Sequence, residues 1–183
     1  MELIHETDRL YLKILDASWA PSVCSFYQKN KVSFEAVEPP RIPNFYTVSF
    51  HKLNLIQEYN EFMHGHYLRL YLFEKSNPKK IIGSICYNSF RTGCFQSCTL
   101  GYKTDVDARN LGYMSEALSY SIHHIISAEY GLHRIEAMVL PDNYVSIHLL
   151  EKSGFFLEGC ARDYAKLNGV WKDHFRYSML LYQ

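Results

Sequence analysis

The sequence predicts an α+β fold, a mixed β-sheet flanked by helices. Residues 67–74 and 80–90 are rich in aromatic and β-branched side chains, which favours two strands, and residues 75–79 between them have the composition of a hairpin turn. Residues 117–126 instead carry apolar side chains at intervals of three and four residues, which predicts a helix with one apolar face. That face needs a sheet to cover, so strands and helices are expected to pack in layers.

The first part of the chain opens with a strand and a helix. Residues 9–15 alternate between apolar and polar side chains, and Asp16 can cap a following helix that ends near Asn30. Residues 37–46 contain three prolines and little periodicity, so we expect an ordered surface loop of the kind that often carries specificity. A second helix over residues 49–62 should end by Gly65.

Clear breaks separate the remaining elements. A strand over residues 96–104 follows the hairpin, and another over residues 134–140 is broken by Pro141-Asp142-Asn143. A helix over residues 144–152 follows and is closed by Ser153-Gly154. The chain finishes as two strands, over residues 155–166 and 170–181, joined by a tight turn at Asn168-Gly169.

Length and charge limit the classes of function. The 183 residues suit one domain, residues 1–183, with a sizeable core. Lys plus Arg number 19, as do Asp plus Glu, so no overall positive field attracts nucleic acid. The N-terminus lacks a signal-peptide pattern, and no run approaches the roughly 18 apolar residues of a membrane helix. We therefore expect a cytoplasmic protein with no membrane partner, whose oligomeric state the sequence leaves open.

The cysteines and histidines do not suggest a metal site. The five cysteines form no C-x-x-C pair, so we expect reduced, mostly buried thiols. His64-Gly65-His66 lacks a third spaced ligand and is interpreted as a helix end, while His123 and His124 are expected to face solvent.

The most informative motif covers residues 109–114. It follows a strand-like run and leads into an amphipathic helix, so its backbone N–H groups would lie at the N-terminus of that helix. Free N–H groups at a helix N-terminus bind anions. Asn110 tolerates a left-handed backbone better than most residues. Asp105 and Asp107 would oppose an anion there unless they face solvent. The sequence therefore predicts a phosphate-binding loop.

Six short segments occur in a distinctive order and spacing: Leu100-Gly101-Tyr102, Arg109-x-x-Gly112-Tyr113-Met114-x-Glu116-Ala117, His133-Arg134-Ile135, Asn143-x-x-Ser146, Glu151-Lys152-x-Gly154-Phe155 and Gly169-x-Trp171-x-Asp173-His174. Together they resemble the GNAT acetyltransferases, and within them the RimJ/RimL group of ribosomal-protein alanine N-acetyltransferases. The resemblance implies a strongly twisted sheet whose fourth and fifth strands splay apart. It also implies acetyl-CoA as the acyl-donor co-substrate in that cleft.

The resemblance also implies which residues hold the donor. Its pantetheine arm would pair with backbone groups of the fourth strand, at Tyr102, Lys103 and Thr104. Its pyrophosphate would bind the loop N–H groups, helped by the dipole of the following helix. The residues implied are Arg109, Asn110, Leu111, Gly112, Tyr113 and Met114.

Catalytic candidates lie further along the chain. Asn143 is read as a helix N-cap, and the resemblance adds a contact with the cofactor. Ser146 could be a plain helix residue, but the matching serine of RimL-like enzymes is proposed to protonate the departing thiolate, which makes Ser146 the candidate acid. In the family's best-described members a glutamate acts as the general base, but the aligned position here is Ala165, so that assignment does not carry over to this chain. Glu136 on the fifth strand is either a base pointing into the cleft or an exposed strand carboxylate.

The acceptor is not identified by a motif. Tyr164 and Trp171 either form walls of an acceptor groove or pack across the last hairpin. The leading hypothesis is acetyl transfer to a protein or peptide N-terminus, which the loop, Ser146 and the RimJ-like end of the chain imply through the resemblance. An α-amine is also the easier acceptor, because it is far more often neutral near pH 7 than lysine is. The alternatives are a small amine, such as an antibiotic, polyamine or peptide-like metabolite, and a non-catalytic acyl-CoA-binding regulatory module.

Overall fold

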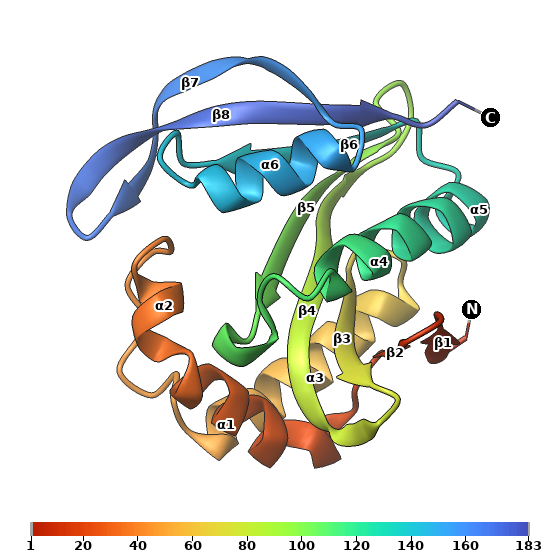
Figure 1. Ribbon diagram of the computed structural model, residues 1–183, viewed down its shortest axis with the longest axis vertical. Coiled ribbons are helices and arrows are strands. Elements are labelled where there is room, and N and C mark those ends of the chain that lie inside the picture. Colours follow the sequence, from red (N-terminus) through yellow and green to blue (C-terminus); the bar gives the residue numbers. More distant parts are fainter. Residues whose placement is uncertain (1, 183) are drawn as a thin grey trace.

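A computed structural model describes residues 2–182 as an eight-stranded mixed sheet with the order β1-β2-β3-β4-β5-β6-β8-β7 (Figure 1). The strands are β1 (Ile4–Glu6), β2 (Leu10–Lys13), β3 (Leu68–Glu74), β4 (Asn77–Arg91), β5 (Ser97–Thr104), β6 (Arg134–Val139), β7 (Phe156–Leu167) and β8 (Val170–Leu180). The helical segments are η1 (Ala17–Trp19), α1 (Ala20–Lys29), α2 (Lys31–Glu35), α3 (Val48–Met63), η2 (Val106–Ala108), α4 (Tyr113–Tyr120), the π-helical η3 (Ser121–Ile126), α5 (Ser127–Tyr130) and α6 (Tyr144–Lys152). The predicted α+β class is confirmed.

Strand alternation divides the core in two. Leu70 and Leu72 of β3 point into one cluster, which also contains Leu118 of α4, whereas Tyr71 and Phe73 point into a second cluster around α1 and α3. Successive side chains of a strand face opposite sides of the sheet, so each face of β3 is covered by a different set of helices.

Most predicted boundaries hold to within a few residues. The helix expected over residues 144–152 is α6, and the loop expected over residues 37–46 lies between α2 and α3. The turn expected over residues 75–79 is wrong in length, because β4 already begins at Asn77. The short helix α2, directly after Asn30, was not predicted.

The cysteine prediction needs a correction. All five thiols are free, but only Cys24 and Cys98 are buried, Cys86 is half-buried, and Cys94 and Cys160 are exposed. His64 ends α3, and both His123 and His124 are exposed, as expected.

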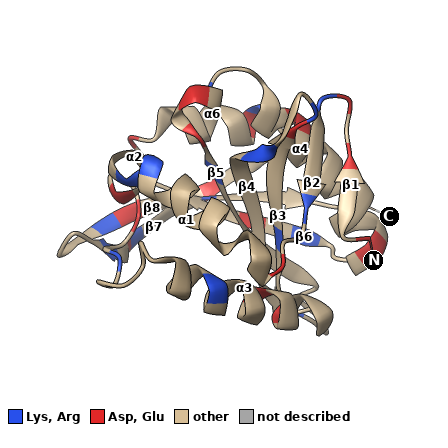
Figure 2. Cartoon of the chain, turned by 90° about the horizontal axis from the view of Figure 1, so that it is seen from below, with Lys and Arg blue, Asp and Glu red and all other residues tan. Residues whose placement is uncertain are grey.

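Charged side chains of both signs are spread over the helices and strands rather than gathered on one face (Figure 2). This distribution agrees with the equal numbers of basic and acidic residues. Within residues 2–182, no helix combines the length and apolar character needed to cross a membrane.

Candidate active site

The candidate site lies where β5 and β6 separate. The two strands pair in parallel over three residue pairs, the last of which joins Thr99 to Glu136. Beyond Thr99, β5 turns away from β6 (Figure 1), so the backbone of residues 100–104 has no strand partner on that side within the described chain. A cavity of about 190 Å³ fills the opening and is lined from β5, β6, α6 and β8, with Val37 and Glu38 at one side.

The first turn of α6 forms one wall of this cavity. The Asn143 side chain accepts a hydrogen bond from the Ser146 N–H at 3.2 Å, which confirms its role as N-cap. The Tyr102 hydroxyl reaches across from β5 and donates to the Ser146 carbonyl oxygen at 3.2 Å. Asn143, Ser146 and Tyr102 all line the cavity, so these predicted residues are brought together. The bond from Tyr102 fixes the start of α6 relative to the free part of β5.

Loop 109–114 contains two left-handed residues just before the start of α4. Asn110 adopts φ 61° and Gly112 adopts φ 78°, both left-handed, and Gly112 is the N-cap residue of α4. Asn and Gly are the residue types that tolerate this conformation best. Met114 points into the core and is 6 % exposed, so its side chain leaves the loop surface free.

The start of the chain holds this loop in place. Arg9 donates to the Leu111 carbonyl oxygen at 3.0 Å and forms an ion pair with Glu116 at 2.6 Å. The Thr7 hydroxyl also donates to Glu116. Burial alone would raise the pKa of Glu116, but the hydrogen bonds from Thr7 and Arg9 outweigh it and lower the pKa. Glu116 is therefore a fixed carboxylate in the first turn of α4.

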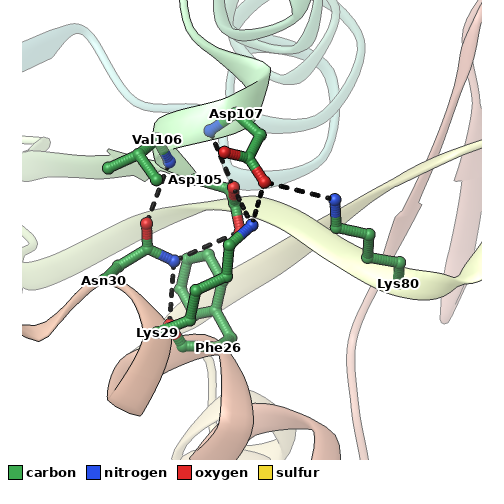
Figure 3. A network of polar contacts seen from close by, with 7 residues as sticks. All are labelled: Phe26, Lys29, Asn30, Lys80, Asp105, Val106 and Asp107. Atoms are coloured by element: carbon green, nitrogen blue, oxygen red, sulfur yellow. Dashed lines mark hydrogen bonds and ion pairs between the residues drawn. The ribbon is translucent and has the colours of Figure 1, made fainter.

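Asp105 and Asp107 do not face the loop as free charges. Lys29 lies 2.6 Å from Asp105 and 2.5 Å from Asp107, while Asn30 donates to Asp105 and accepts from the Val106 N–H (Figure 3). Asp105 is buried rather than solvent-facing. Burial raises the pKa of its carboxyl, but hydrogen bonds from Lys29, the Asp107 N–H and Asn30 outweigh it and lower the pKa. Both carboxylates are thus paired with Lys29 rather than left as free charges beside the loop, Asp105 inside the protein and Asp107 at its surface.

His174 of β8 is a cavity residue whose role the sequence did not suggest. It is buried, and its Nδ1 atom lies 3.1 Å from the Lys172 carbonyl oxygen. A carbonyl oxygen only accepts, so Nδ1 is the donor in this contact, and Nε2 is the ring nitrogen that the contact leaves free to exchange a proton. The segment Gly169-x-Trp171-x-Asp173-His174 contained this residue, but only burial and strand pairing reveal that it lines the cavity.

Three of the residues predicted for catalysis or the acceptor groove lie outside the cavity lining, as do Thr104 and the predicted phosphate loop at residues 109–114. Both carboxylate oxygens of Glu136 are engaged, one by Arg91 and one by Arg134, each at 2.8 Å, so the position of Glu136 does not support a role as base. Tyr164 and Trp171 are exposed on the β7–β8 hairpin, where the Tyr164 ring lies 5.1 Å from the His174 ring. Neither aromatic residue borders the cavity in this structure.

A mixed sheet whose parallel strands β5 and β6 separate around a cavity is the arrangement expected for a GNAT acetyltransferase. The family model described as "Acetyltransferase (GNAT) domain" matches residues 9–156. The chain therefore belongs to the GNAT acetyltransferase family, and it is an acyltransferase.

Individual relatives agree with this assignment. The chain is 32% identical to the probable N-acetyltransferase YjcK of Bacillus subtilis (strain 168) over 90% of both sequences. It is 31% identical to the [Ribosomal protein uS5]-alanine N-acetyltransferase of Escherichia coli (strain K12), over 92% of this chain and 86% of the relative. Among solved structures, the ribosomal-protein-S5-alanine acetyltransferase of Vibrio fischeri superposes with a TM-score of 0.91 at 27% identity, over 98% of this chain and 97% of that one.

Proposed function

We propose that this protein, as a single domain in the cytoplasm, transfers an acetyl group from acetyl-CoA to the α-amine of a protein or peptide N-terminus. The observation that carries the proposal is the cavity between β5 and β6, in which the free backbone of β5 faces Asn143, Ser146 and His174. The likeness to the uS5-alanine N-acetyltransferase supports a protein N-terminus as acceptor.

The residues present fit the proposed donor. Acetyl-CoA supplies the acetyl group as a thioester, which an amine can attack directly. On the side of β5 that faces β6, the backbone at Tyr102, Lys103 and Thr104 has no strand partner and offers hydrogen-bonding groups to the extended pantetheine arm. The left-handed residues Asn110 and Gly112 turn the chain into the start of α4, whose dipole favours phosphate.

Two side chains that line the cavity would move the protons. Nε2 of His174 takes a proton from the ammonium form of the acceptor, which frees the lone pair of the amine nitrogen. That nitrogen bonds to the thioester carbon, the carbon–sulfur bond breaks, the departing thiolate takes the proton of the Ser146 hydroxyl, and the proton still in excess on the nitrogen returns to Ser146. An α-amine has a pKa of about 7.7–8.0, so a modest base is sufficient near neutral pH.

The test measures thiol release from acetyl-CoA with peptides of varied first residues, alongside polyamines and aminoglycosides. Acetyl-CoA binding is measured in parallel. We expect turnover with peptides and not with the small amines. Binding of acetyl-CoA without turnover of any peptide would refute the proposal. Turnover of a small amine alone would also refute it and would indicate an acetyltransferase that modifies small metabolites.

A further inference from the structure

A second cavity, of about 350 Å³, adjoins the first on the side of α1 and α3. Lys103 lines both cavities, so its side chain forms their shared wall. The second cavity is enclosed by charged and aromatic side chains from five parts of the chain. The charged and aromatic residues of the lining include Arg41, Phe45, His51, Glu58, Arg69 and Lys103.

Two of the charges in this cavity balance each other. Arg69 lies 3.2 Å from the Glu58 carboxylate and also donates to the Tyr27 hydroxyl at 2.9 Å. His51 adds no charge at neutral pH, because burial and the nearby Arg69 and Arg41 guanidinium groups lower its pKa to about 4. The remaining charges are those of Lys103 and Arg41.

Lys103 and Arg41 share a single carboxylate. Glu38 forms ion pairs with both, and its side chain is only 17% exposed. Two cations and one anion leave an excess positive charge in a largely buried place, which is costly unless a further anion compensates it. Four buried polar atoms in or beside the cavity also lack a hydrogen-bond partner: Nε of Arg41, Nε2 of His51, whose residue is 1% exposed, and Oε2 of both Glu38 and Glu58. Of these, Nε of Arg41 is a donor that an incoming carboxylate can use. The cavity therefore offers charge and hydrogen-bonding capacity that the chain itself does not use.

Glu38 is suited to give way to another carboxylate. It lies in the segment between α2 and α3 that has no helix or strand hydrogen bonds, and it borders the first cavity. A residue in such a segment can move at less cost than one in a strand. The Glu38 carboxylate thus marks the position at which a carboxylate can pair with both Lys103 and Arg41.

We propose that Lys103 and Arg41 bind an aspartate or glutamate side chain within the first two residues of the acceptor peptide, an inference that rests on the proposed function. Without a peptide, the Glu38 carboxylate occupies this place between Lys103 and Arg41, and the acidic side chain of the peptide displaces it. Because Lys103 borders both cavities, a peptide whose amine lies in the first cavity has its first residues beside Lys103, since an extended chain advances by only about 3.3–3.6 Å per residue. The proposal therefore places the acidic side chain at residue 1 or 2.

The experiment compares kcat/KM for peptides that differ only by Asp or Asn, at position 1 in one pair and position 2 in another. For at least one pair we expect the Asp peptide to be favoured by about tenfold, which is typical of a hydrogen bond to a charged group. Arg41→Gln should bring this Asp/Asn ratio close to one. Glu38→Gln should raise the ratio through a lower KM for the Asp peptide.

A matched control is Lys79→Gln, which removes one positive charge from an exposed position on β4 and should leave the ratio unchanged. Acetyl-CoA binding by each variant shows that the fold is intact. Equal use of Asp and Asn peptides, or a ratio unaffected by Arg41→Gln, would overturn the inference while the proposed function stands. If acetyl-CoA binds and no peptide is acetylated, the proposed function itself fails, and this inference fails with it.

Discussion

The Nδ1 atom of His174 lies 3.1 Å from the carbonyl oxygen of Lys172, two residues earlier on β8. This contact orients the imidazole ring at the wall of the first cavity and leaves Nε2 as the atom that can accept a proton. Side chains that are oriented by a backbone contact are well suited to general base catalysis, because the ring does not need to reorganise.

We expect His174→Gln to lower kcat/KM for a peptide by about 100-fold at pH 7, within the usual range for loss of a general base. The loss should shrink above pH 8, where the α-amine of the peptide is already neutral. The measurement is kcat/KM from pH 6 to 9 for both proteins, with His123→Gln, an exposed residue of η3, as the control. A loss that is constant across this pH range would indicate a structural role for His174.

Ser146→Ala should reduce kcat by at least about tenfold and leave the dissociation constant of acetyl-CoA nearly unchanged. A group that protonates the leaving thiolate acts mainly in the transition state, so its loss affects turnover rather than binding. Steady-state kinetics and calorimetric binding separate the two effects, and Ser127→Ala on α5 is the matched control. Equal losses in binding and turnover would make Ser146 a cofactor contact instead.

Gly112→Val should weaken CoA binding by at least about tenfold. A β-branched residue at φ 78° is strained by roughly 1–2 kcal/mol and places a side chain where the backbone is proposed to meet the pyrophosphate. Asn110→Gly is the counterpart, because glycine keeps the left-handed conformation without strain, and we expect its affinity for CoA to stay within about threefold. Unchanged CoA binding by Gly112→Val would mean that the pyrophosphate lies elsewhere.

Asp105→Asn should lower the free energy of unfolding by about 2 kcal/mol at pH 7, since it removes the charge that Lys29 and Asn30 bind. Asp107→Asn, whose side chain is 63% exposed, should cost less than about 0.5 kcal/mol. Denaturant unfolding measures both. Equal effects of the two substitutions would contradict the importance of burial.

The same carboxylate predicts a pH dependence. The pKa of Asp105 is lowered in the folded protein, so its contribution is complete above the unfolded value of about 3.9 and is lost as the pH falls through the lower folded value. The stability difference between the wild-type protein and Asp105→Asn should therefore be constant from pH 5 to 7 and decrease below about pH 4. A difference that persists unchanged at pH 2 would argue against an ionised Asp105.

Local patterns accounted for most of the fold and part of the site. The cap at Asn143 and the left-handed turn at Gly112 are set by a few neighbouring residues, so the sequence predicted the helix α6 and the start of α4. The pairing of Glu136 with Arg91 joins residues 45 positions apart, and no local signal reveals it.

The second cavity shows the same limit more clearly. Glu38 and Lys103 are 65 positions apart, and Glu38 lies in a segment without periodicity. Their contact depends on how the loop between α2 and α3 folds over β5, which is a property of tertiary packing. The role of His174 also became visible only when strand pairing placed it beside α6.

Thr7 and Arg9 contact Glu116, and Arg9 also contacts Leu111, so residues more than a hundred positions earlier in the chain hold the loop that is proposed to bind the pyrophosphate. During synthesis, Thr7 and Arg9 therefore leave the ribosome well before the loop that they later hold. A purification tag or truncation that displaces these two residues would disturb the proposed donor site, although it lies far from the loop in sequence.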